Sequence, residues 1–136
     1  TRRTDYAVKA LLTIAKAERP LPAGELAKEL SMPKAFLRGI LQTLAAKKIL
    51  DSAKGPSGGF SLARPARRIT LASVIKAFQG ELSFNDCMFR KRICPDRAVC
   101  PLRKEILDIE SAVISRFETI TIDSLMKKMQ KRRPGH

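Results

Sequence analysis

Apolar residues recur at helical spacing along the first part of the chain and predict three consecutive helices. The first covers residues 4–17, with Thr4 as its capping residue, and the second is a short helix over residues 23–30. The third ends at Lys47 and follows a tight turn in which Ser31 is the candidate cap. A short helix, a tight turn and a longer helix together indicate a helix-turn-helix.

A polar, glycine-rich turn follows the third helix and predicts a β-hairpin. Short strands are expected over residues 49–53 and 60–63, joined by the segment Lys54-Gly55-Pro56-Ser57-Gly58-Gly59. A hairpin directly after a helix-turn-helix makes a winged helix. The expected fold class is therefore mainly α with a small β-hairpin wing, and a long dimerisation helix is expected to follow it.

Beyond the wing, a helix capped by Thr70 ends at Gly80, and Thr121 is the candidate cap of a short final helix. Between them, an apolar stripe begins at Pro101 and runs for about five helical turns, which is more than a small winged domain can cover. The stripe therefore predicts a dimer interface. The expected domains are a winged helix-turn-helix over residues 1–80, a cysteine cluster-binding loop over 81–100, and a dimerisation helix with a basic tail over 101–136.

The chain is strongly basic, with 27 Lys and Arg against 13 Asp and Glu in 136 residues and a formal net charge of +14. This excess favours a polyanionic partner, while 44% hydrophobic residues suffice for a folded core. Since no apolar run reaches the length of a membrane span and the start lacks a signal-peptide stretch, we expect a soluble cytoplasmic protein without a membrane partner. No nucleophile and base pair or phosphate-binding loop is evident, so an enzyme is not expected.

The third predicted helix has a polar side suited to the major groove of DNA. With Leu37, Ile40 and Leu41 facing the core, the opposite side carries Lys34, Ala35, Arg38, Gly39 and Gln42. Arg38 can contact guanine and Gln42 can contact adenine. A solvated helix face is the plain alternative, and an RNA-binding protein of similar charge would be expected to show a basic and aromatic sheet signature that is missing here.

The other predicted DNA contacts come from the wing and the start of the chain. Glycines let the wing backbone approach a phosphate or follow the minor groove, and Lys54 is the side chain carried inward. The candidate contacts are Lys54, Ser57, Gly58 and Gly59 in the wing and Arg2 and Arg3 at the chain start. Arg64, Arg67 and Arg68 are further candidates for salt-sensitive contacts with the DNA backbone.

Three cysteines with the spacing Cys87-x6-Cys94-x5-Cys100 indicate ligands or a sensor rather than disulfides. Their spacing is too wide for the paired ligands of structural zinc. Widely spaced thiolates, two of them followed by proline as at Cys94 and Cys100, suit an iron-sulfur cluster. The candidates for a fourth ligand are Asp5, Asp86, Asp96, His136 or an outside molecule. Free or reversibly oxidised thiols are the alternative, and a haem site lacks an evident second axial ligand.

These motifs together resemble the Rrf-two family of bacterial winged-helix regulators, which includes IscR-like and NsrR-like iron-sulfur sensors. The resemblance covers nearly the whole chain and is carried by Thr4-Asp5-Tyr6-Ala7-Val8-Lys9-Ala10-Leu11, by the wing Gly55-Pro56-Ser57-Gly58-Gly59-Phe60 and by the three cysteines. It implies a homodimer joined by the long helix, which reads a partly palindromic operator in double-stranded DNA.

The resemblance also implies a set of cluster ligands. In NsrR-like members an aspartate of the first helix, supplied by the partner subunit, completes a 4Fe-4S cluster, and Asp5 matches that position. IscR-like members use a histidine shortly after the third cysteine with a 2Fe-2S cluster, and residues 101–105 contain none. The implied ligands are therefore Cys87, Cys94, Cys100 and Asp5, with 4Fe-4S favoured over 2Fe-2S.

The expected function is thus a DNA-binding transcriptional regulator, most simply a repressor. It would sense redox state, nitric oxide or iron-sulfur status through a bound cluster. The alternative is a cluster-free winged-helix regulator that senses by cysteine oxidation or through a partner protein. The signal, the target genes and the form that binds DNA more tightly are left open by the sequence.

Overall fold

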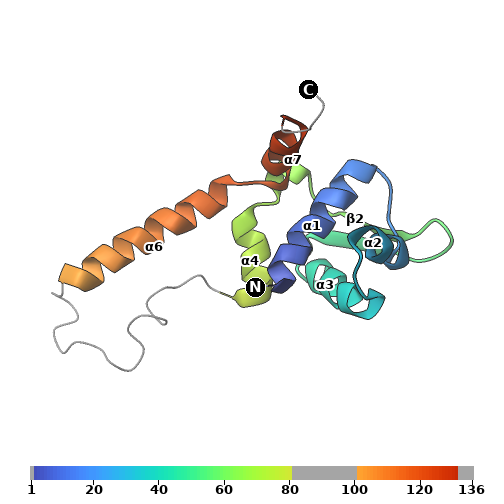
Figure 1. Cartoon of the computed structure of the whole chain (residues 1–136), viewed down its shortest axis with the longest axis horizontal. Coiled ribbons are helices and arrows are strands. Elements are labelled where there is room, and N and C mark those ends of the chain that lie inside the picture. Colours follow the sequence, from blue (N-terminus) through green and yellow to red (C-terminus); the bar gives the residue numbers. More distant parts are fainter. Residues whose placement is uncertain (1, 81–100, 132–136) are drawn as a thin grey trace.

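In the computed structural model, which describes residues 2–80 and 101–131, a helical body carries a two-stranded hairpin and one long projecting helix (Figure 1). The elements in chain order are α1 (Arg2–Ala17), α2 (Ala23–Leu30), α3 (Lys34–Ala46), β1 (Leu50–Ala53), β2 (Gly59–Leu62), the 3-10 helix η1 (Ala66–Arg68), α4 (Leu71–Gln79), α6 (Pro101–Thr119) and α7 (Ile122–Lys131). The expected fold class, mainly α with a hairpin wing, is confirmed.

The core lies where α1, α2 and α3 meet. Their apolar residues recur at helical spacing on the inner faces, and Leu11, Leu26, Leu37 and Leu41 are fully buried. Burying one such side chain contributes about 1.5–3 kcal/mol. Neither α2 nor α3 has a side-chain cap hydrogen bond, so packing rather than capping holds the helix-turn-helix together.

Two predicted helix caps are wrong. Thr4 lies inside α1 and is buried, because the helix already includes Arg2. Ser31 closes α2 instead of opening α3: its φ is 54°, and its N–H donates to the carbonyl of Lys28 at 3.3 Å. The residue that precedes α3 is Pro33, which has extended backbone. The turn between α2 and α3 is short, and its hydroxyl residue, Ser31, ends α2.

The wing is an antiparallel pair of strands in which Leu50 faces Leu62. Leu21, ahead of α2, extends this sheet: its N–H donates to the carbonyl of Phe60 at 3.0 Å, and the N–H of Phe60 donates back at 2.8 Å. Gly59 allows this approach, since its φ is +141° and a Cβ there would lie 2.5 Å from the carbonyl carbon of Leu21. The wing is thereby fixed to the segment that starts the helix-turn-helix.

The starts of α4 and α7 lie side by side. Thr70 and Thr121, the residues just before α4 and α7, form an antiparallel bridge. Both are the caps that the sequence predicts, because their side-chain oxygens accept hydrogen bonds from the N–H groups of Ser73 at 3.1 Å and Ser124 at 3.0 Å. Ile122, the first residue of α7, is fully buried and anchors that helix in the core.

Helix α6 projects from the helical body, packs against α4 and buries none of its side chains (Figure 1, orange). Its apolar stripe is partly uncovered: Leu102 and Ile109 are exposed to 58% and 54%, whereas Ile106, Val113 and Phe117 are half-buried. The dimer interface expected on this helix stays a prediction. Within residues 2–80 and 101–131, no helix is long and apolar enough to cross a membrane.

Candidate nucleic-acid interface

One side of α3 carries the predicted DNA-reading residues. Lys34, Ala35, Arg38 and Gln42 are exposed, and Gly39 is half-buried, whereas the apolar side of the helix is fully buried. The burial of that apolar side fixes the rotation of α3 about its axis. Arg38 and Gln42 therefore stand one turn apart on the outer surface, where both can reach the edges of neighbouring base pairs.

A groove of about 510 Å³ lies between α3, the start of α2 and the wing. It brings together residues that are far apart in the sequence: Arg38 and Gln42 from α3, and Lys54, Gly58 and Gly59 from the wing. None of the residues that line this groove is acidic. The groove therefore combines hydrogen-bonding side chains with positive charge, which is the character of a surface that accepts DNA.

Within the wing, the predicted contact residues divide by exposure. Lys54 and Ser57 are exposed, whereas Gly58 is buried. A Cβ at Gly58 would lie 2.2 Å from the carbonyl oxygen of Ala53, so glycine at this position serves the tight closure of the hairpin. Of the predicted wing contacts, Lys54 and Ser57 are thus the two with exposed side chains.

Arg2 and Arg3 lie at the start of α1, and neither lines the groove. Both are exposed, but the guanidinium carbon of Arg3 lies 5.3 Å from the centroid of the Phe78 ring. This contact connects the first turn of α1 to the end of α4. The structure gives Arg3 a packing partner in addition to its predicted DNA contact.

Phe36 is a surface residue of α3 that the sequence pattern did not single out. Its side chain is 38% exposed, and its ring meets that of Tyr6 edge to face, with the centroids 5.9 Å apart and an interplanar angle of 88°. On a helical wheel Phe36 stands about a quarter turn from the buried side, between the core and the polar face. Periodicity alone assigns such a residue to neither face.

The predicted cluster ligands can be placed only in part. Asp5 lies exposed in the first turn of α1, where it can reach a group outside its own helix. Cys87, Cys94 and Cys100 lie outside the described residues, as do the other fourth-ligand candidates Asp86, Asp96 and His136. Among the residues that the structure describes, no group of three His, Cys, Asp or Glu side chains is placed to hold a metal ion.

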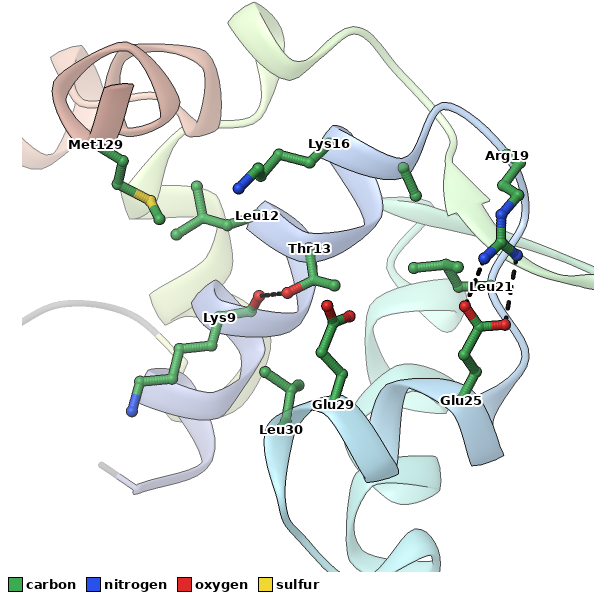
Figure 2. A pocket seen from close by; sticks show the side chains of 11 residues that line it. Lys9, Leu12, Thr13, Lys16, Arg19, Leu21, Glu25, Glu29, Leu30 and Met129 are labelled. Carbon is green, nitrogen blue, oxygen red and sulfur yellow. Dashed lines mark hydrogen bonds and ion pairs between the residues drawn. The ribbon is translucent and has the colours of Figure 1, made fainter. Parts of the chain in front are cut away.

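A second pocket, of about 410 Å³, lies between α1, α2 and α7 (Figure 2). Apolar residues such as Leu12 and Met129 line it together with charges of both signs. At one side, Arg19 donates two hydrogen bonds to the carboxylate of Glu25, and this pair raises the pKa of Arg19 above its ordinary value. The predicted DNA-binding residues do not line this pocket.

Comparison with known proteins agrees with this arrangement. The profile of the Rrf2 family, described as an iron-dependent transcriptional regulator, matches residues 1–128. The HTH-type transcriptional repressor NsrR of Streptomyces coelicolor is 25% identical over 93% of this chain and 86% of its own length.

Two solved structures share the fold. CymR, the global cysteine regulator of B. subtilis, superposes with a TM-score of 0.78 and 20% identity, covering 94% of this chain and 95% of its own. IscR of T. potens superposes with a TM-score of 0.77 and 19% identity, covering 100% of this chain and 91% of its own.

Proposed function

The chain belongs to the Rrf2 family of transcriptional regulators, which bind DNA and are not enzymes, and from this premise we propose that it is a repressor that reads its operator through the groove between α3 and the wing. The observation that carries the proposal is the lining of that groove, where Arg38, Gln42 and Lys54 converge and no acidic residue is present. Arg38 would pair with guanine, Gln42 with adenine, and Lys54 with the backbone or the minor groove.

Selection from a pool of random duplexes, followed by affinity measurements on the selected operator, tests this proposal. Arg38→Ala is expected to relax the preference for one guanine and Gln42→Ala that for one adenine, each by about 1–3 kcal/mol. Lys16→Gln, which removes an exposed cation of the second pocket, is the control and should leave the preference unchanged. If Arg38→Ala weakens binding to every sequence equally, Arg38 contacts phosphate and does not read a base.

We also propose that the protein is a homodimer joined along α6. Leu102 and Ile109 are the members of the apolar stripe that the described part of one chain leaves exposed. A second copy of the helix would cover it in the manner of a coiled coil. Two recognition helices would then face two half-sites about one helical turn of DNA apart.

Sedimentation velocity checks the dimer. Ile109→Glu is expected to give monomers, because it places a charge in the apolar stripe. Lys104→Glu is the matched control, since Lys104 is exposed and lies across the helix from Ile109. A dimer that persists in the Ile109→Glu variant would show that the subunits associate through another surface.

For the regulatory signal, the proposal assigns an iron-sulfur cluster to Cys87, Cys94, Cys100 and Asp5 of the partner subunit. The support within the described structure is Asp5, which is exposed in the first turn of a helix that contacts both α3 and α4. A cluster bound by residues of both subunits would link the subunits, and loss of the cluster would break that link. Because the ligands come from both subunits, its loss would alter the spacing of the two recognition helices and so relieve repression.

The cluster is tested on protein purified without oxygen, by visible absorption together with iron and sulfide analysis. We expect broad absorption with about four irons per subunit, by analogy with known 4Fe-4S ligation. Replacing all three cysteines by serine should abolish the absorption and make DNA affinity insensitive to nitric oxide. A colourless wild-type protein whose DNA affinity changes on thiol oxidation would establish the cluster-free alternative.

A further inference from the structure

The base of the wing carries a group of cations outside the groove. They lie at the end of α3, just after β2 and in η1, and we call them the wing-base strip: Lys47, Lys48, Arg64, Arg67 and Arg68. The hairpin brings the two chain segments of the strip together, and Arg64 Nε donates to the carbonyl of Lys48 at 3.4 Å. The short helix η1 then holds the last two arginines next to this pair, with the N–H of Arg68 bonded to the carbonyl of Pro65 at 2.8 Å.

The strip has no acidic partner in the described part of the chain. None of its five side chains forms an ion pair there, although an exposed arginine elsewhere, Arg19, is paired with Glu25. Four of the five are exposed, and Arg64 is half-buried. Like charges on neighbouring segments repel one another, and a bound polyanion would remove that repulsion.

The strip begins where the groove ends. Ala45 is the last residue of α3 that lines the groove, and Lys47 follows it two residues later. From there the strip leads away along the wing base to η1, which packs against α7. A duplex seated in the groove would place the phosphates of its operator between α3 and the wing loop. None of the five strip residues lines the groove, so the strip is separate from the proposed base-reading surface.

We propose that the wing-base strip binds the phosphate backbone of the DNA that flanks the operator. This inference rests on the proposed function, because it requires a duplex in the groove. It gives the strip a task distinct from base reading: to add salt-sensitive affinity that depends on the length of the duplex and not on its flanking sequence.

The test compares two duplexes that share the selected operator, one limited to it and one extended by about one helical turn, or roughly 10 base pairs, at each end. The double variant Arg67→Gln/Arg68→Gln is expected to bind the extended duplex about tenfold more weakly, with a salt slope lowered by about 0.9 for each lost phosphate contact. Its affinity for the limited duplex should stay that of the wild type. Lys9→Gln/Lys16→Gln removes the same charge from the second pocket and should bind both duplexes like the wild type.

Two results would overturn the inference. Equal losses on both duplexes would place the strip within the operator interface, and no loss on either would show that it does not contact DNA. The failure of the proposed function looks different, because the wild type would then select no operator. In that case the strip is tested on a mixed-sequence duplex of the extended length. A salt dependence of binding that is the same in the double variant and the wild type would exclude contact between the strip and phosphate.

Discussion

Gly39 is a point on α3 where stability and recognition make opposite demands. It occupies the middle of the helix, where glycine is less favourable than alanine by about 0.5–1 kcal/mol. A Cβ at this position would meet no atom within 4 Å, so packing within the chain does not require glycine there. The close approach of DNA to the proposed reading face does give a reason for it.

The substitution Gly39→Ala should therefore raise the free energy of unfolding by about 0.5–1 kcal/mol and at the same time weaken operator binding. Chemical denaturation and affinity measurement on the same preparation check the two effects. Gly24→Ala in α2 is a comparison for stability alone, because its Cβ would lie 3.8 Å from the side chain of Lys34, a predicted DNA contact. A Gly39→Ala protein that binds operator as tightly as the wild type would remove this residue from the DNA interface.

At the residue scale, periodicity correctly predicted exposure where the burial of other residues in the same helix determines it. Arg38 and Gln42 could be assigned to the outer surface because the buried leucines fix the helix rotation. Phe36 could not, since its ring position depends on Tyr6, a residue thirty positions earlier in the chain. The cap prediction at Ser31 failed because this residue lies between two helices and could cap the end of one or the start of the other.

Between elements, the ring pair of Tyr6 and Phe36 joins α1 to the first turn of α3. Asp5, the proposed cluster ligand, immediately precedes Tyr6 in the same helix. A change in the position of the first turn of α1 would therefore reach the recognition helix through this contact. Both rings are partly accessible, so their contact is open to substitution without emptying the core.

A double-mutant cycle with Tyr6→Leu and Phe36→Leu measures this contact. We expect a coupling free energy of about 0.5–1.5 kcal/mol, the value typical of edge-to-face aromatic pairs beyond their burial. Lys9→Gln is a suitable comparison, because Lys9 belongs to α1 itself and lies over the same Tyr6 ring, with its Nζ 5.2 Å from the centroid. Additive effects of the two leucine substitutions would mean that the rings do not fix α3 against α1.

Elements with a local signal were predicted well, and contacts between distant segments were not. The helices and the caps Thr70 and Thr121 follow from spacing within one or two turns. The pairing of Leu21 with Phe60 joins the turn before α2 to the wing, and its only trace in the sequence is Gly59, which also suits an ordinary hairpin turn. The groove itself depends on that pairing.

For the whole molecule, the proposed site divides its ligands between two subunits, and mixed dimers can test this division. A dimer of one Asp5→Ala subunit and one Cys87→Ser subunit has one complete ligand set if Asp5 acts across the interface. It has no complete set if each subunit uses its own aspartate. With differently tagged subunits, we expect the mixed dimer to hold about half the iron of the wild type, since a two-fold dimer has two equivalent sites.

The two parent variants, each as a homodimer, are the controls and should both hold less iron than the mixed dimer. Iron content in the mixed dimer no higher than in its parents would place Asp5 and the cysteines in the same subunit. In that arrangement the coupling of cluster loss to dimer geometry would no longer follow. Asp5 is exposed, so its replacement tests ligation without disturbing the core.

The bridge between Thr70 and Thr121 holds the start of α4 beside the start of α7. Because α4 packs its buried Val74 into the core, the chain that follows α4 is the insert with fixed ends. The entropy of closing such a loop grows only slowly with its length, by about 0.6 kcal/mol for each doubling. Residues can therefore be added to or removed from the regulatory segment while the DNA-binding half keeps its own fold. Sensor segments of different chemistry could be exchanged between the end of α4 and the start of α7, and one DNA-reading unit would then answer to different signals.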